Sequence, residues 1–114
     1  MPYLTIQTNK NFDNNLVKPL LQQASQTVAE LLGKPENYVM VALPPAVPML
    51  FAGSDEPAAY LELKSIGLPQ ESTVSFSNAL CTIVSDQLGI AKERIYIEFA
   101  NAERSMWGWN GKTF

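Results

Sequence analysis

Hydrophobic positions along this chain switch between the period of a strand and the period of a helix. Leu4 and Ile6 alternate with polar neighbours, as in a half-buried strand. From Leu16 to Leu32, and again from Phe76 to Leu88, apolar residues recur at the spacing of one helical face. The pattern therefore predicts strands over 3–8, 38–43, 58–66 and 95–99, and helices from Asp13 to Gly33 and through 76–88 up to Gly89.

The predicted elements occur twice in the same order. Each helix ends at a glycine, Gly33 or Gly89, and a strand that contains a tyrosine, Tyr38 or Tyr96, follows within a few residues. We interpret this as a duplicated strand-helix-strand unit. Such a crossover is right-handed and makes its two strands parallel. Two units side by side predict an α+β fold, with a four-stranded mixed sheet and both helices on one face.

The other face of that sheet is expected to be bare. Tyr60, Leu61 and Leu63 suggest that it is partly apolar, so a partner must cover it, and a symmetric oligomer is the simplest candidate. The tail, 105–111, adds a short extended segment with an Asn-Gly turn.

Length and composition predict one soluble globular domain spanning 1–114, with 46% hydrophobic and 17% charged residues. The prolines in the longest apolar stretch rule out a membrane span there, and the start of the chain has no leader pattern. We therefore expect a cytoplasmic protein, with leaderless secretion left open. A net charge of −3 and scattered cations argue against a nucleic-acid partner.

The chain has no histidine and a single cysteine, Cys81, which we interpret as a buried small hydrophobe. This composition removes His-dependent triads and the usual zinc ligands, so no metal site is predicted. Proton chemistry is left to carboxylates, lysines, tyrosines and the terminal amine. Removal of Met1 would expose the secondary amine of Pro2, and a free α-amino group has a pKa of roughly 7.7 to 8.0.

Five short motifs occur in order along the whole length of the chain. They are Pro2 before a strand, Gly33-Lys34-Pro35, Ser65-Ile66-Gly67, Arg94-Ile95-Tyr96-Ile97 and Gly108-Trp109-Asn110. Together these motifs resemble the macrophage migration inhibitory factor family of the tautomerase superfamily. This resemblance implies a trimer-forming tautomerase-like fold with active sites at subunit interfaces and no cofactor. It also implies keto-enol tautomerisation of phenylpyruvate-like aromatic α-keto acids and dopachrome-type compounds.

The resemblance also implies roles for individual residues. Pro2 would be the general base, and Lys34 would bind the substrate carboxylate and lower the pKa of the amine. Lys34 taken alone is equally a helix C-terminal lysine that interacts with the helix dipole. The backbone amide of Ile66 would hold the carboxylate, and Tyr96 would reach the site from the neighbouring subunit. An aromatic wall would comprise Tyr3, Tyr38, Trp107, Trp109 and Phe114.

Three positions depart from the family pattern. Glu98 stands where the family commonly has asparagine, and a carboxylate there would repel an anionic substrate or raise the pKa of the base. Trp107 replaces a smaller apolar residue and would narrow the pocket mouth. Ala58 and Leu61 occupy the positions of a Cys-x-x-Cys pair, so the thiol chemistry attributed to that pair cannot transfer.

Two other functions stay open. One is a cytokine-like binding protein with weak or vestigial tautomerase activity, for which a receptor or host protein would be the partner. The other is a different reaction on the same scaffold, such as decarboxylation or hydration of a small keto acid. It ranks lower because the motifs supply no second strong acid-base group.

Overall fold

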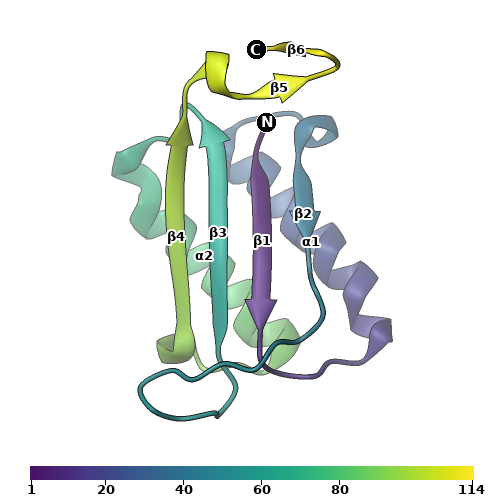
Figure 1. The fold of residues 1–114 in the computed structure, drawn as a ribbon, viewed down its shortest axis with the longest axis vertical. Helices are drawn as coiled ribbons and strands as arrows, with labels where there is room; N and C mark the ends of the chain where they lie inside the picture. The colour runs from purple at the N-terminus through teal and green to yellow at the C-terminus, as the bar shows by residue number, and fades with distance from the viewer.

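The computed structural model describes residues 1–114 as one four-stranded sheet with two helices on one face (Figure 1). The other face of the sheet is uncovered in the single chain. The strand order is β2-β1-β3-β4. The strands are β1 (Tyr3–Thr8), β2 (Met40–Ala42), β3 (Ala59–Ile66) and β4 (Ile95–Ala102), and the helices are α1 (Asn14–Leu32) and α2 (Thr73–Leu88).

The sheet confirms the predicted duplication. β1 pairs in parallel with β2 across α1, and β3 pairs in parallel with β4 across α2. The two units meet where β1 and β3 run antiparallel, with Leu4 opposite Leu63 and Tyr3 opposite Lys64. The sheet is therefore mixed, and each unit contributes one central strand and one edge strand.

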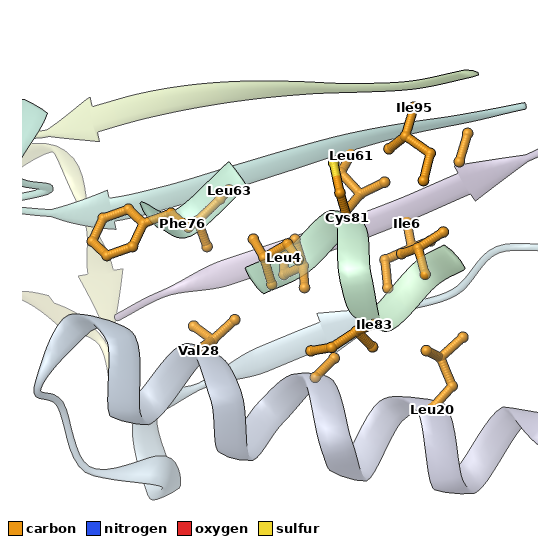
Figure 2. Packing of buried hydrophobic residues seen from close by; sticks show 14 of the residues in the cluster. Leu4, Ile6, Leu20, Val28, Leu61, Leu63, Phe76, Cys81, Ile83 and Ile95 are labelled. Atoms are coloured by element: carbon orange, nitrogen blue, oxygen red, sulfur yellow. The ribbon is translucent and has the colours of Figure 1, made fainter. Parts of the chain in front are cut away.

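Buried side chains fill the space between the helices and the sheet, and Figure 2 shows Leu4, Ile6, Leu61 and Leu63 of the sheet facing residues from both helices. Each fully buried aliphatic side chain contributes about 1.5–3 kcal/mol relative to an exposed one. Cys81 lies in this core cluster, as expected for a buried small hydrophobe. The helical members of the cluster are Leu20, Ala24 and Val28 of α1 and Phe76, Leu80, Cys81, Ile83, Val84 and Leu88 of α2.

Local signals set the ends of the helices. The Asp13 side chain accepts a hydrogen bond from the Asn15 amide at 2.9 Å and caps the start of α1. Gly33 ends α1 in the left-handed region at φ 62°, which glycine adopts without steric cost. The Lys10 ammonium donates to the Leu88 carbonyl at 2.6 Å and so satisfies an orphan acceptor at the end of α2.

Two strand boundaries differ from the sequence prediction. Tyr38 was expected in a strand over 38–43, but it ends a 3-10 turn, η1 (Glu36–Tyr38), and β2 has only three residues. The turn forms because the Tyr38 amide donates to the Pro35 carbonyl at 3.2 Å. β4 continues past the expected end at Phe99 to Ala102, because pairing with β3 persists through the Ile66–Ala102 register.

The prediction of a partly apolar open face, made from Tyr60, Leu61 and Leu63, is wrong for the two leucines. Both leucines are fully buried against the helices. Because strand side chains alternate, β3 presents Tyr60, Glu62 and Lys64 to the open face instead. The open face is therefore amphipathic and carries charge.

The tail forms a hairpin rather than a single extended segment. β5 (Gly108–Trp109) pairs with β6 (Lys112–Thr113) around the predicted Asn-Gly turn, whose residues have φ values of 55° and 76°. No helix combines the length and apolarity needed to cross a membrane. The remaining 3-10 turns are η2 (Gln70–Ser72), η3 (Lys92–Arg94) and η4 (Arg104–Met106).

Candidate functional site

A pocket of about 470 Å³ lies at the amino terminus, beside the carboxy-terminal hairpin. Figure 1 shows the first residue close to β5 and to the end of the sheet where β1 begins. The lining is mainly apolar and aromatic. It comprises Met1, Pro2, Tyr3, Asn37, Tyr38, Val39, Met40, Lys64, Trp107, Gly108, Trp109 and Phe114.

The duplicated topology brings these distant segments together. α1 returns the chain to the start of β1, so the turn after α1 lies beside Pro2. Pro2 is fully buried, and its carbonyl accepts a hydrogen bond from the Met40 amide at 3.0 Å. The Met1 ammonium donates to the Tyr38 carbonyl at 2.8 Å. The start of the chain is therefore fixed on both sides.

The electrostatics of this site favour a neutral amine. Burial, and then the nearby Lys34 ammonium, lower the pKa of the Met1 amine below its ordinary value. Lys34 follows the Gly33 cap and is half-buried, and its amide donates to the Ala29 carbonyl at 3.0 Å. Lys34 acts on the amine through its charge, although it is not one of the residues that line the pocket.

The rings of Tyr38, Trp109 and Phe114, which the family resemblance implied for an aromatic wall, lie together on one side of the pocket. The Tyr38 ring meets Trp109 edge-on at 5.6 Å and Phe114 at 6.0 Å between ring centroids. Trp109 stacks on Phe114 at 5.7 Å. Such pairs contribute about 0.5–1.5 kcal/mol each beyond the burial of their area. Tyr3 and Trp107 line the same pocket, so all five predicted wall residues converge.

Three other predicted residues lie outside this pocket in the single chain. Ile66 is buried at the end of β3. Tyr96 is exposed near the opposite end of β4, and Glu98 is exposed about halfway along this strand. In the sheet register Tyr3 lies level with Ala100, so Tyr96 is four residues away, about 13 Å along the strand.

Tyr96 instead lines a second pocket of about 440 Å³ with residues of the loop before β3. Its ring lies 4.6 Å from that of Phe51 between centroids. Arg94 holds this loop in place, and its guanidinium packs on the ring of Phe51, 5.1 Å from the ring centroid. It also donates, at 3.0 to 3.1 Å, to the carbonyls of Phe51, Ser54, Glu56 and Pro57.

The open face between the two pockets carries paired carboxylates. Glu62 and Glu98 are opposite each other in the parallel register. Burial and these two carboxylates raise the pKa of the Tyr60 hydroxyl, because both disfavour the phenolate. No three His, Cys, Asp or Glu side chains are grouped so that they could hold a metal ion.

Sequence reasoning missed Lys64, which is the only lining residue of the first pocket with a charged side chain. It also missed Asn37 of the η1 turn, Val39 directly after that turn, and Met40, the first residue of β2. The available signal for Lys64 was the alternation along β3: Leu63 and Ser65 face the core, so the residue between them faces outward. What the alternation does not reveal is its cross-strand partner, Tyr3.

The duplicated β-α-β units, with an amino terminus that lines an aromatic pocket, define a protein with the tautomerase-like fold. A family model described as macrophage migration inhibitory factor matches residues 1–114. The chain belongs to the macrophage migration inhibitory factor family, which lies within the tautomerase superfamily. Membership of this family supports an isomerase or tautomerase kind of activity.

Named relatives share the full length of the chain. A homologue from Brugia malayi is 42% identical over 115 residues, covering 100% of this chain and 99% of the relative. The Mus musculus protein is 33% identical with the same coverage. The crystal structure of a Prochlorococcus marinus homologue is 44% identical, with a TM-score of 0.92 and 98% of each chain covered. A Toxoplasma gondii structure is 33% identical, with a TM-score of 0.93 and coverage of 98% and 99%.

Proposed function

We propose that the chain, after removal of Met1, is a keto-enol tautomerase for phenylpyruvate-like aromatic α-keto acids and dopachrome-type compounds. The observation that carries this proposal is the fixed amino terminus, where Pro2 is buried and where partial burial and Lys34 lower the pKa of the Met1 amine. The same two causes would act on the amine of Pro2, which is more buried than Met1. A neutral secondary amine near pH 7 is a competent proton acceptor.

In the proposed reaction the Pro2 nitrogen moves one proton between two atoms of the substrate. In ketonisation it accepts the enol hydroxyl proton and returns a proton to the benzylic carbon. Enolisation runs the same steps in reverse, so no oxidant or co-substrate is needed. The charge of Lys34, which lowers the pKa of the Met1 amine, would favour the neutral form of the Pro2 amine in the same way and attract the anionic substrate.

The aromatic wall supports the choice of substrate class. Tyr38, Trp109 and Phe114 offer ring faces and edges to an aromatic substituent. The Ile66 amide remains our proposed contact for the carboxylate, as Ile66 lies two residues beyond Lys64 on β3.

We further propose a homotrimer in which Tyr96 completes the site of the neighbouring subunit. Tyr96 is too far from Pro2 to act within one chain, yet it is 64% exposed and lines the second pocket. Glu98 lies on the same face, two residues away, and would enter the same interface. Glu98 stands where the family commonly has asparagine, and we expect its negative charge to weaken the binding of anionic substrates.

Replacing Pro2 by glycine tests the identity of the base. A Pro2→Gly variant, with Met1 removed, should lose most of its phenylpyruvate turnover, because a primary amine on a flexible residue replaces the positioned secondary amine. The matched control is Pro45→Gly, which changes an exposed loop proline and should keep the wild-type rate. An unchanged rate in Pro2→Gly contradicts the mechanism.

The second candidate is a cytokine-like binding protein, which membership of this family and Glu98 favour. In that function the pocket is a vestige and an outer surface binds a receptor or host protein. Correctly processed protein that shows no enol turnover would favour this alternative. Robust turnover would favour the enzyme.

A further inference from the structure

We propose that Lys64 is a second anion-binding group of the amino-terminal pocket and selects ligands that carry a carboxylate next to an aromatic arm. This inference deepens the proposed function and rests on the same site. Lys64 lines the pocket with Pro2 and the aromatic wall, whereas Lys34 acts from outside the lining. Positive charge therefore acts on the pocket both from Lys64 in its lining and from Lys34 outside the lining.

The fold fixes the position of Lys64 through the central pair of strands. Lys64 is opposite Tyr3, the residue that follows Pro2, in the antiparallel register of β1 and β3. Its neighbours Leu63 and Ser65 are fully buried, so the strand cannot rotate without exposing core residues. The Lys64 side chain therefore emerges at the same end of the sheet as the proposed base.

The Lys64 ammonium is available to a ligand. Its ion-pair partner is Glu62 of the same strand at 3.5 Å, with side-chain exposures of 47% and 35%. An ion pair this exposed contributes only about 0–1 kcal/mol. A substrate carboxylate that enters the less polar pocket offers a stronger, charge-assisted partner. Lys64 therefore loses little free energy when it leaves Glu62 to bind the carboxylate of a ligand.

The rest of the lining defines the other half of the ligand. Tyr38, Trp109 and Phe114 form an aromatic surface, and no acidic side chain lines the pocket. A ligand with a ring at one end and a carboxylate at the other matches this arrangement. A neutral analogue of the same shape keeps the ring contacts and loses the contact with Lys64.

Tryptophan fluorescence gives a direct binding test, because the two tryptophans of the chain, Trp107 and Trp109, both line the pocket. The probes are 3-phenylpropionate, which cannot tautomerise because it has no keto group, and its neutral amide. In Lys64→Gln we expect about tenfold weaker binding of the acid, or about 1.4 kcal/mol, and unchanged binding of the amide. Lys64→Arg should bind the acid within about threefold of wild type.

Lys18→Gln is the matched control, since Lys18 is an exposed lysine on α1, and it should bind both probes as the wild type does. Equal weakening of acid and amide in Lys64→Gln would show that the residue only shapes the pocket. Unchanged acid binding would show that Lys64 does not contact the carboxylate. Either result overturns the inference.

The binding test separates this inference from the proposed function. If the wild type binds the acid through Lys64 but does not turn over phenylpyruvate, the tautomerase proposal fails and the Lys64 site stands. If turnover is present, Lys64→Gln should raise KM for phenylpyruvate about tenfold and leave kcat within about twofold. Turnover with an unchanged KM in this variant overturns the Lys64 inference alone.

Discussion

At the scale of single residues, the pKa of the amine decides when the proposed base can accept a proton. Lys34 lowers the pKa of the terminal amine in this structure, second in effect to burial. A lower pKa makes the amine neutral at lower pH, so proton transfer remains active further into the acid range.

We therefore predict that Lys34→Gln moves the acidic limb of the rate-pH profile to higher pH. Removing the cation raises the pKa of the amine, so more of the base is protonated and inactive at a given acidic pH. The check is kcat/KM for phenylpyruvate from pH 5 to 9, with Lys18→Gln as the charge-matched control. An acidic limb that stays in place would show that Lys34 does not tune the base.

At the scale of elements, the loop before β3 depends on one side chain that comes from the η3 turn, directly before β4. Arg94 donates hydrogen bonds to four backbone carbonyls in the loop between Phe51 and Pro57 and packs on the Phe51 ring. Because Phe51 in turn packs on Tyr96, this contact also positions the residue proposed to reach a neighbouring site.

Arg94→Met should lower the free energy of unfolding by about 2–3 kcal/mol, because the loop carbonyls lose their charged donor while the apolar stem is retained. Urea unfolding followed by circular dichroism measures this loss. The control is Arg104→Met, since Arg104 makes one exposed hydrogen bond, to the Phe114 carbonyl, and should change stability by less than about 0.5 kcal/mol. An equal loss of unfolding free energy in the two variants would contradict the role of Arg94 in holding the loop.

The elements also show what the sequence could and could not predict. Both helices follow from their apolar period and their glycine ends, since these signals are local. The 3-10 turn at Tyr38 was missed because an apolar run after Pro35 fits a strand and a turn equally well by pattern. Lys64 was missed because a pocket contact depends on cross-strand register, which only the folded sheet fixes.

The site residues also differ in how far the sequence could predict their positions. The wall formed by Tyr38, Trp109 and Phe114 was predicted from the family resemblance, and the structure brings the three rings together. Periodicity alone could not have joined a turn near the start of the chain to its last residue. Tyr96 remains outside the pocket of its own chain, so its proposed role depends on assembly.

At the scale of the whole molecule, the uncovered face of the sheet and the proposed role of Tyr96, which lies far from Pro2 in one chain, lead us to expect a partner subunit. We predict a mass about three times the 12.6 kDa of one chain in light scattering at micromolar concentration. A monomeric mass would contradict a site that combines Pro2 of one subunit with Tyr96 of its neighbour.

Subunit mixing tests the sharing itself. We expect Pro2→Gly and Tyr96→Ala each to lower turnover when assayed alone. Unfolding and refolding the two variants together at equal amounts should restore about a quarter of the wild-type sites, because each needs an intact Pro2 and an intact neighbouring Tyr96. The measurement is phenylpyruvate turnover of the mixture, compared with each variant refolded alone. No gain over the separate variants would place both residues in the same chain's site.

The amino terminus itself gives the most direct test of the account. While Met1 is attached, the Pro2 nitrogen is an amide without a basic lone pair, and Met1 lines the pocket. Phenylpyruvate turnover should be measured on two samples whose intact masses show Met1 removed in one and retained in the other. We predict turnover in the sample that lacks Met1 and almost none in the sample that keeps it. Equal turnover in both would contradict Pro2 as the base.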